Sequence, residues 1–171
     1  MKSIHLPIKD PASRLACLLV CILLSPLAAA HDIVRRSDSD LPMASSVLVP
    51  AGAEWVLVGS TLPRASNPAA PVGSAERLGD TSAQAADVLA QIAQELGAQG
   101  FAMQDVVRLT VYLVADPARD GAVDYAGLMS AYLRHFGKDD GGLPVRTTVE
   151  VAGLPVPGVL VAMEARAPRG G

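Results

Sequence analysis

Few residues in this chain have the type and placement to do chemistry. Both cysteines, Cys17 and Cys21, lie within the first 30 residues, so a chain that begins after them has no thiol nucleophile and no disulfide. The three histidines, His5, His31 and His135, lack the spacing of metal ligands, and a metal site needs several such groups. We therefore expect no metal in this protein.

Arg146 is the side chain best placed to act. It opens a predicted strand after a glycine-rich loop, where a side chain can face a cleft. Its guanidinium is a planar fork that binds a carboxylate through two parallel hydrogen bonds, a geometry that lysine lacks. Taken alone, such an arginine is more often a surface residue in an ion pair. The nearby Asp139-Asp140 pair is typical of a solvated turn, not of a catalytic dyad.

The first 30 residues have the pattern of an export signal. Lys2, Lys9 and Arg14 precede the apolar run 15–24, and the small residues 28–30 follow it as a cleavage site. A membrane-spanning helix needs about 20 apolar residues, and this run is shorter. We expect a signal peptide over 1–30, export to the periplasm or the medium, and no membrane attachment after cleavage. An uncleaved membrane anchor is the alternative, and a mature protein that retains Met1 would contradict the cleavage.

Composition places the rest of the chain among globular domains. The chain has 171 residues, of which 50% are hydrophobic and 18% charged, too apolar for a disordered protein. Its net charge is −3, and no basic run is longer than Arg35-Arg36. A nucleic-acid-binding protein normally carries a basic patch, so we expect no nucleic-acid partner. Segment 31–42 is polar and is predicted to be a flexible leader, with a single domain over 43–171.

The elements that must position Arg146 follow from periodicity and turn residues. Short apolar runs at 46–49 and 55–58 predict a hairpin through the turn 50–53, and 63–79 has the prolines and glycines of a loop. Thr81 or Ser82 can cap a helix. The apolar residues of that helix recur at helical spacing: Ala85, Val88, Leu89, Ile92 and Leu96.

The second half of the chain predicts a strand, a helix and two more strands. The β-branched segment 106–114 is typical of a strand in the centre of a sheet. A helix is expected over 123–136, and strands over 145–152 and 159–166. The expected helix has an apolar stripe, which predicts the side that faces the core: Tyr125, Leu128, Met129, Tyr132, Leu133 and Phe136. The order β-β-α-β-α-β-β predicts an α/β (α+β) fold, with a mixed sheet and both helices on one face.

Three separated segments resemble one known family. Residues 144–155, PVRTTVEVAGLP, are similar to the Pro-x-Arg-(Ser/Thr)-x-Val-Glu-Val-x-x-Leu-Pro signature of the Rid family, the reactive intermediate deaminases, also called YjgF-like. Residues 105–112, DVVRLTVY, resemble the central strand of that family. The first predicted helix carries further matches at Gln84, Leu89, Ile92 and Gly100.

The resemblance implies a chorismate-mutase-like fold, a homotrimer, and ligand clefts between subunits. It also implies hydrolysis of small 2-imino and enamine acids to 2-oxo acids and ammonia, without metal or organic cofactor. By this resemblance Arg146 is the arginine that binds the substrate carboxylate and is the expected catalytic residue.

The sequence departs from the family pattern at the other site positions. Ala162 stands where active members carry a water-positioning glutamate, and Met129 stands where an asparagine is common. The stretch 59–63, GSTLP, replaces the usual Ser-Gly-Gln-x-Pro turn, and Thr148 stands in place of a frequent cysteine. The expected substrate-binding set is therefore Arg146, Gly59, Ser60, Met129, Thr148 and Ala162.

Two functions follow from this set. The first is an exported imine and enamine deaminase, in which Glu164 or Glu150 is an open candidate for the missing carboxylate. The alternative is a non-catalytic trimer that binds small carboxylates through Arg146. A structural or chaperone-like trimer is a third hypothesis, and a large exposed apolar area would favour it.

Overall fold

The structure is a computed structural model that describes residues 32–38, 40–137 and 142–170. The predicted signal peptide 1–30 and the Asp139-Asp140 pair lie outside these residues. None of the helices in the described ranges is both long and apolar enough to cross a membrane.

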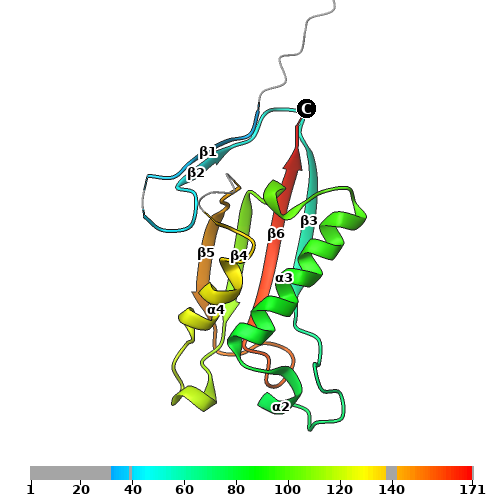
Figure 1. Ribbon diagram of the computed structural model, residues 1–171, viewed down its shortest axis with the longest axis vertical. Helices are drawn as coiled ribbons and strands as arrows, with labels where there is room; N and C mark the ends of the chain where they lie inside the picture. Colours follow the sequence, from blue (N-terminus) through cyan, green and yellow to red (C-terminus); the bar gives the residue numbers. More distant parts are fainter. Residues whose placement is uncertain (1–31, 39, 138–141, 171) are drawn as a thin grey trace, which may run out of the picture. The chain divides into compact units, whose positions relative to one another are not determined.

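A four-stranded sheet with two helices on one face forms the body of the protein (Figure 1). Its strands are β3 (Glu54–Thr61), β4 (Arg108–Leu113), β5 (Val145–Glu150) and β6 (Val161–Arg169), in the order β3-β6-β4-β5. β6 is antiparallel to both neighbours, whereas β4 and β5 are parallel. The crossover between β4 and β5 contains α4 (Tyr125–Tyr132), and α3 (Thr81–Ala98) packs beside it. The predicted mixed sheet and fold class are confirmed.

The N-cap of helix α3 lies one residue before the first of the two predicted caps. Asp80, not Thr81 or Ser82, is the N-cap: its Oδ1 accepts a hydrogen bond of 2.8 Å from the Ala83 N–H. The predicted apolar stripe of α3 is fully buried against the sheet. The predicted loop 63–79 also contains a short helix, α2 (Ala75–Leu78), which Ser74 caps.

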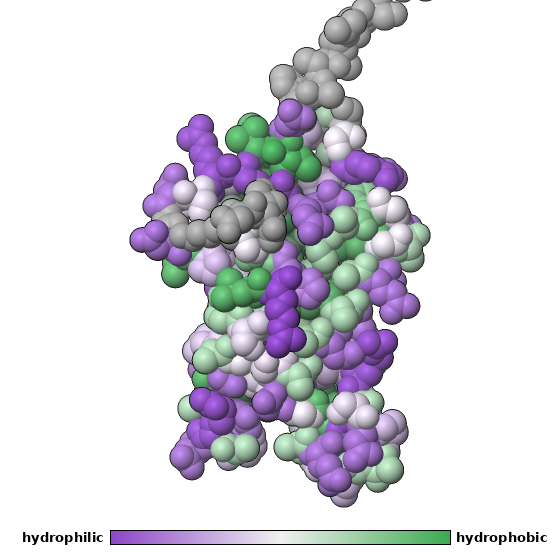
Figure 2. Space-filling model, viewed as in Figure 1, coloured by the Kyte–Doolittle hydropathy of each residue, from purple (hydrophilic) through white to green (hydrophobic). Residues whose placement is uncertain are grey.

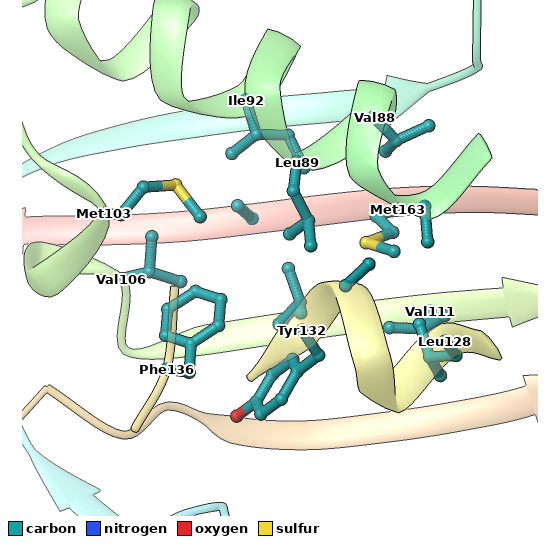
Figure 3. Packing of buried hydrophobic residues seen from close by; sticks show 14 of the residues in the cluster. Val88, Leu89, Ile92, Met103, Val106, Val111, Leu128, Tyr132, Phe136 and Met163 are labelled. Atoms are coloured by element: carbon teal, nitrogen blue, oxygen red, sulfur yellow. The ribbon is translucent and has the colours of Figure 1, made fainter. Parts of the chain in front are cut away.

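The core lies between the sheet and the two helices (Figure 3). Alternate residues of β4, Leu109, Val111 and Leu113, are buried on the helix-bearing face together with Val161 and Met163 of β6. The helix α4 contributes Leu128 and Tyr132, and Phe136 follows it. Because side chains alternate between the two faces of the sheet, only every second residue of a strand can reach a site beside the helices.

The apolar stripe predicted for 123–136 holds only in part. The helix spans Tyr125–Tyr132, and the side chains at its two ends, Tyr125 and Leu133, are 52% and 51% exposed. A helix of two turns packs over its middle, so its terminal positions extend beyond the buried surface.

The predicted hairpin of 46–49 with 55–58 is wrong. β2 (Ser46–Leu48) pairs instead with β1 (Val34–Arg36), and β3 pairs along its length with β6. The longer β3 satisfies more backbone groups on β6 than it could on a three-residue strand. β1 also lies inside the segment predicted as a flexible leader, so that prediction fails for 34–36. Arg35 anchors this strand by donating to the Gln104 carbonyl at 2.9 Å.

Backbone contacts hold the segment before β6 close to the loop before α2. Gly158 has a φ of +78°, and a Cβ at this position would lie 2.7 Å from the Gly73 carbonyl oxygen. Only glycine adopts that conformation at little cost and leaves room for this approach. Gln84 of α3 binds the same segment, since its Nε2 donates to the Gly158 carbonyl at 3.0 Å and its Oε1 accepts from the Leu160 N–H at 2.7 Å.

A carboxylate on α3 attaches the segment that follows β3 to the helix, and this contact predicts an acid-sensitive contribution to stability. Asp87 accepts hydrogen bonds from the Arg64 backbone N–H at 2.8 Å and from the Arg64 guanidinium at 2.6 Å. Partial burial raises the pKa of Asp87, but the hydrogen bonds and charge of Arg64, with a further bond from Gln91, together hold that pKa below its usual value.

We expect Asp87→Asn to flatten the loss of stability in acid. A depressed pKa means that the contact stabilises the fold above the unfolded pKa of about 3.9 and is lost as pH falls through the lower folded pKa. Urea unfolding of the wild type and of Asp87→Asn between pH 7 and pH 3 measures this. Glu95→Gln, an exposed carboxylate on the same helix, is the control. An equal acid dependence in wild type and Asp87→Asn would contradict the assignment.

Candidate functional site

Arg146 lies on β5, at one edge of the sheet, with its side chain on the helix-bearing face. Its partner in the parallel register is the buried Leu109, and the guanidinium carbon lies 4.4 Å from the centre of the Tyr132 ring. Nη1 donates a hydrogen bond of 3.0 Å to Sδ of Met129. Strand register and helix α4 thus place a half-buried cation on an aromatic and thioether surface.

Tyr132 supports Arg146 as a platform. It is fully buried, and its hydroxyl donates to the Pro42 carbonyl at 2.8 Å. Burial raises the pKa of Tyr132 to about 12, a change that the nearby charge of Arg146 opposes only in part. The phenol therefore remains protonated at ordinary pH. A cation held over an aromatic face gains about 0.5–2 kcal/mol, depending on how far it is desolvated.

The structure brings Arg146, Met129 and Thr148 to one place. Thr148 follows Arg146 by two residues on β5, and its register partner Val111 is buried on the helix-bearing face. Two residues along a strand correspond to about 6.6 Å, so a ligand of a few atoms could contact both side chains. Sequence reasoning missed Tyr132 as a site residue. Its spacing of three from Met129 places both residues on one side of α4, but this spacing does not distinguish a core residue from one that also supports a cation.

Ala162 and Glu164 lie on the opposite face of the sheet. They pair with Tyr112 and Thr110 of β4, whose side chains alternate with the buried ones. Glu164 accepts a hydrogen bond of 3.4 Å from the Tyr112 hydroxyl. Within one chain neither residue can act on a ligand held by Arg146. Glu150 shares the face of Arg146, but four residues along β5 place it about 13 Å away.

Gly59 and Ser60 lie at the other edge of the sheet, on β3. They line a cavity of about 700 Å³ between the free edge of β3 and α3, whose Gln91, Glu95 and Gln99 form the facing side. Three strand spacings separate β3 from β5, about 14 Å, so these residues do not meet Arg146 in one chain. The Thr61 hydroxyl donates to the Gly59 carbonyl at 3.1 Å and thus closes the local turn.

No metal site is found in the described parts of the chain. No cluster there contains three or more of the side chains histidine, cysteine, aspartate and glutamate in reach of one ion. The chemistry available beside Arg146 is therefore recognition of a carboxylate by a guanidinium, with a neutral phenol, a thioether and a hydroxyl around it.

Comparison with known proteins gives a consistent match. The sequence model of the family described as endoribonuclease L-PSP matches residues 66–168. A RutC family protein of Pyrococcus horikoshii is 36% identical over 87 residues, which are 51% of this chain and 61% of that relative. The matched part thus spans less than two thirds of the curated relative.

Solved structures agree with the sequence match. A member of the YjgF/YER057c/UK114 family from Mycobacterium tuberculosis is 26% identical, with 81% of this chain and 100% of that chain covered and a TM-score of 0.51. Escherichia coli TdcF with bound serine is 25% identical, with 71% and 84% covered and a TM-score of 0.53.

Proposed function

Because the chain belongs to the endoribonuclease L-PSP family, which includes the YjgF and Rid proteins, we propose that it binds small 2-imino and enamine acids through Arg146 and hydrolyses them to 2-oxo acids and ammonia. The observation that carries this proposal is the set of contacts that the Arg146 guanidinium makes. Its guanidinium contacts a ring and a thioether, and among the described residues no carboxylate pairs with it and most of its five N–H donors have no partner.

A small carboxylate suits the surroundings of Arg146 better than RNA does. The net charge of −3 disfavours a polyanion as the ligand, in spite of the endoribonuclease in the family description. The amino acid serine, bound by the similar TdcF, is a ligand of the proposed size and carries a carboxylate. Hydrolysis then needs a water at the imine carbon and a proton for the departing nitrogen, and Arg146 contributes the orientation of the substrate.

The proposed active unit is a homotrimer. In one chain the candidate residues lie at two edges of the sheet, Arg146 on β5 and Gly59 and Ser60 on β3. Head-to-tail contact between copies would bring one copy's β5 edge near another copy's β3 edge, and such a contact closes when the rotation fits a ring. Exposed apolar side chains on the sheet face without helices support a contact between copies: Trp55, Leu57 and Val149.

A chaperone-like function has no support on the helix-bearing face. Figure 2 shows that hydrophobic residues on this face occur in small separate groups among hydrophilic ones. A client-binding protein would present a broader apolar surface there.

Release of ammonia tests the proposed reaction. An amino-acid oxidase generates a 2-imino acid in situ, and we expect ammonia to appear faster with the purified protein than in buffer. A rate equal to that of buffer would reject the deaminase function for that substrate. Denatured protein of the same preparation is the control for ammonia carried over with the sample.

A second candidate function, binding of small carboxylates without turnover, is favoured by one residue. Ala162 has no group that can hold or activate water, and loss of one positioned acid or base costs about a hundredfold to ten-thousandfold in rate. Thermal stabilisation by a 2-oxo acid without ammonia release would assign this second function. Absence of both responses would reject the two candidates together.

A further inference from the structure

The contact between Met129 and Arg146 places an oxidisable sulfur at the proposed carboxylate site. The Nη1–Sδ distance is 3.0 Å, and both side chains are partly exposed. A thioether is a weak hydrogen-bond acceptor, so in this state it competes poorly with a carboxylate for the guanidinium. The oxidation state of the Met129 sulfur therefore determines how strongly this side chain competes with a ligand for the Arg146 guanidinium.

Met129 is also more accessible than two of the other three methionines in the described residues. Of the four methionines in the described residues, Met103 and Met163 are buried, with 7% and 0% of their surface exposed. Met43 is partly exposed like Met129, but no hydrogen bond to its sulfur is found in the described chain. The Met129 sulfur adjoins a cation, Arg146, that can stabilise the negative charge developing on a departing oxygen.

We propose that Met129 is an oxidation site for peroxides and that its sulfoxide closes the Arg146 site to carboxylates, an inference that rests on the proposed function. In the reaction the sulfur lone pair attacks one peroxide oxygen, the S–O bond forms and the O–O bond breaks. The sulfur is oxidised by two electrons and hydrogen peroxide is reduced. The transferred oxygen gives up its proton, and the departing hydroxide leaves as water.

The product changes the site because a sulfoxide oxygen is a strong, dipolar acceptor. Bonded to Sδ of Met129, the sulfoxide oxygen can accept a hydrogen bond from Nη1 of Arg146. It then lies beside the N–H donors that a ligand carboxylate would use. A ligand must then break this internal hydrogen bond. We expect binding of pyruvate to weaken about tenfold, the change that corresponds to one charge-assisted hydrogen bond.

The experiment treats the purified protein with hydrogen peroxide, then measures peptide masses and pyruvate affinity by calorimetry. We expect Met129 to gain one oxygen before Met43 does, and affinity to fall as that peptide is converted. Met129→Leu should bind pyruvate equally before and after peroxide, whereas Met43→Leu should lose affinity like the wild type. Met129→Gln, which places an amide oxygen near Arg146, should bind more weakly than Met129→Leu without any oxidant.

Three outcomes separate this inference from the proposed function. Oxidation of Met43 ahead of Met129, or an oxidised protein that binds pyruvate as well as the untreated one, would overturn the inference alone. An untreated wild type that does not bind pyruvate would overturn the proposed function and the closure with it. In that case the peptide masses would still show whether Met129 is oxidised before Met43.

Discussion

Replacement of Arg146 by alanine is expected to weaken pyruvate binding about a hundredfold. A bidentate guanidinium–carboxylate contact consists of two charge-assisted hydrogen bonds, and about 1.4 kcal/mol for each gives a factor of ten twice. Arg146→Lys keeps the charge but loses the planar fork, so its loss should be about tenfold. Calorimetric titration with pyruvate measures all three proteins.

The control for this prediction is a second arginine close in the structure. Arg134 follows α4 and is exposed, so Arg134→Ala removes a positive charge without touching the Tyr132–Met129 surface. We expect it to bind pyruvate like the wild type. If Arg134→Ala and Arg146→Ala bound pyruvate equally weakly, general charge attraction would explain the binding. If Arg146→Ala bound like the wild type, the carboxylate site would be located elsewhere.

The second large effect is expected at Gln84, which is 1% exposed. Its side chain binds three backbone groups: the Gly79 carbonyl, the Gly158 carbonyl and the Leu160 N–H. Gln84→Met keeps a similar volume but makes none of these bonds. It also leaves the buried Leu160 N–H without a partner. We expect a loss of about 3 kcal/mol in the free energy of unfolding, the sum for three lost hydrogen bonds.

Thermal and urea unfolding measure this loss. For a domain of this size it corresponds to a fall of about 10 °C in Tm. Gln94→Met changes an exposed glutamine of the same helix in the same way and should alter stability by less than about 0.5 kcal/mol. Equal stability of the two variants would show that the three hydrogen bonds contribute nothing net.

The sequence predicts those elements whose periodicity is strong. Helix α3 and the strands β4, β5 and β6 occur close to their expected ranges, because long apolar patterns reflect burial. β1 escaped prediction since three residues with alternating exposed side chains carry no apolar signal. The hairpin failed for a different reason. Proximity along the chain favoured a local partner for β3, whereas the native partner, β6, lies about a hundred residues away.

The candidate site, like the fold, could be predicted from the sequence only in part. A motif that resembles a known family pointed to Arg146, and Ala162 and Glu164, two residues apart, lie on one face of β6. Which face that is depends on the register of β6 against β4 and of β4 against β5, and no local pattern encodes it. The platform under Arg146 was missed because Tyr132 in a helix stripe has the same signature whether it only fills the core or also supports a cation.

The position of β6 between β3 and β4 governs how the protein can fold during synthesis. β6 follows every other described strand in the chain, yet it is the strand that joins β3 to the β4–β5 pair. A ribosome-bound chain that has not yet extruded residues 161–169 therefore holds two unconnected halves of a sheet. Pairing at such long sequence separation also slows folding. The sheet of the nascent chain consequently stays open until β6 has emerged from the ribosome.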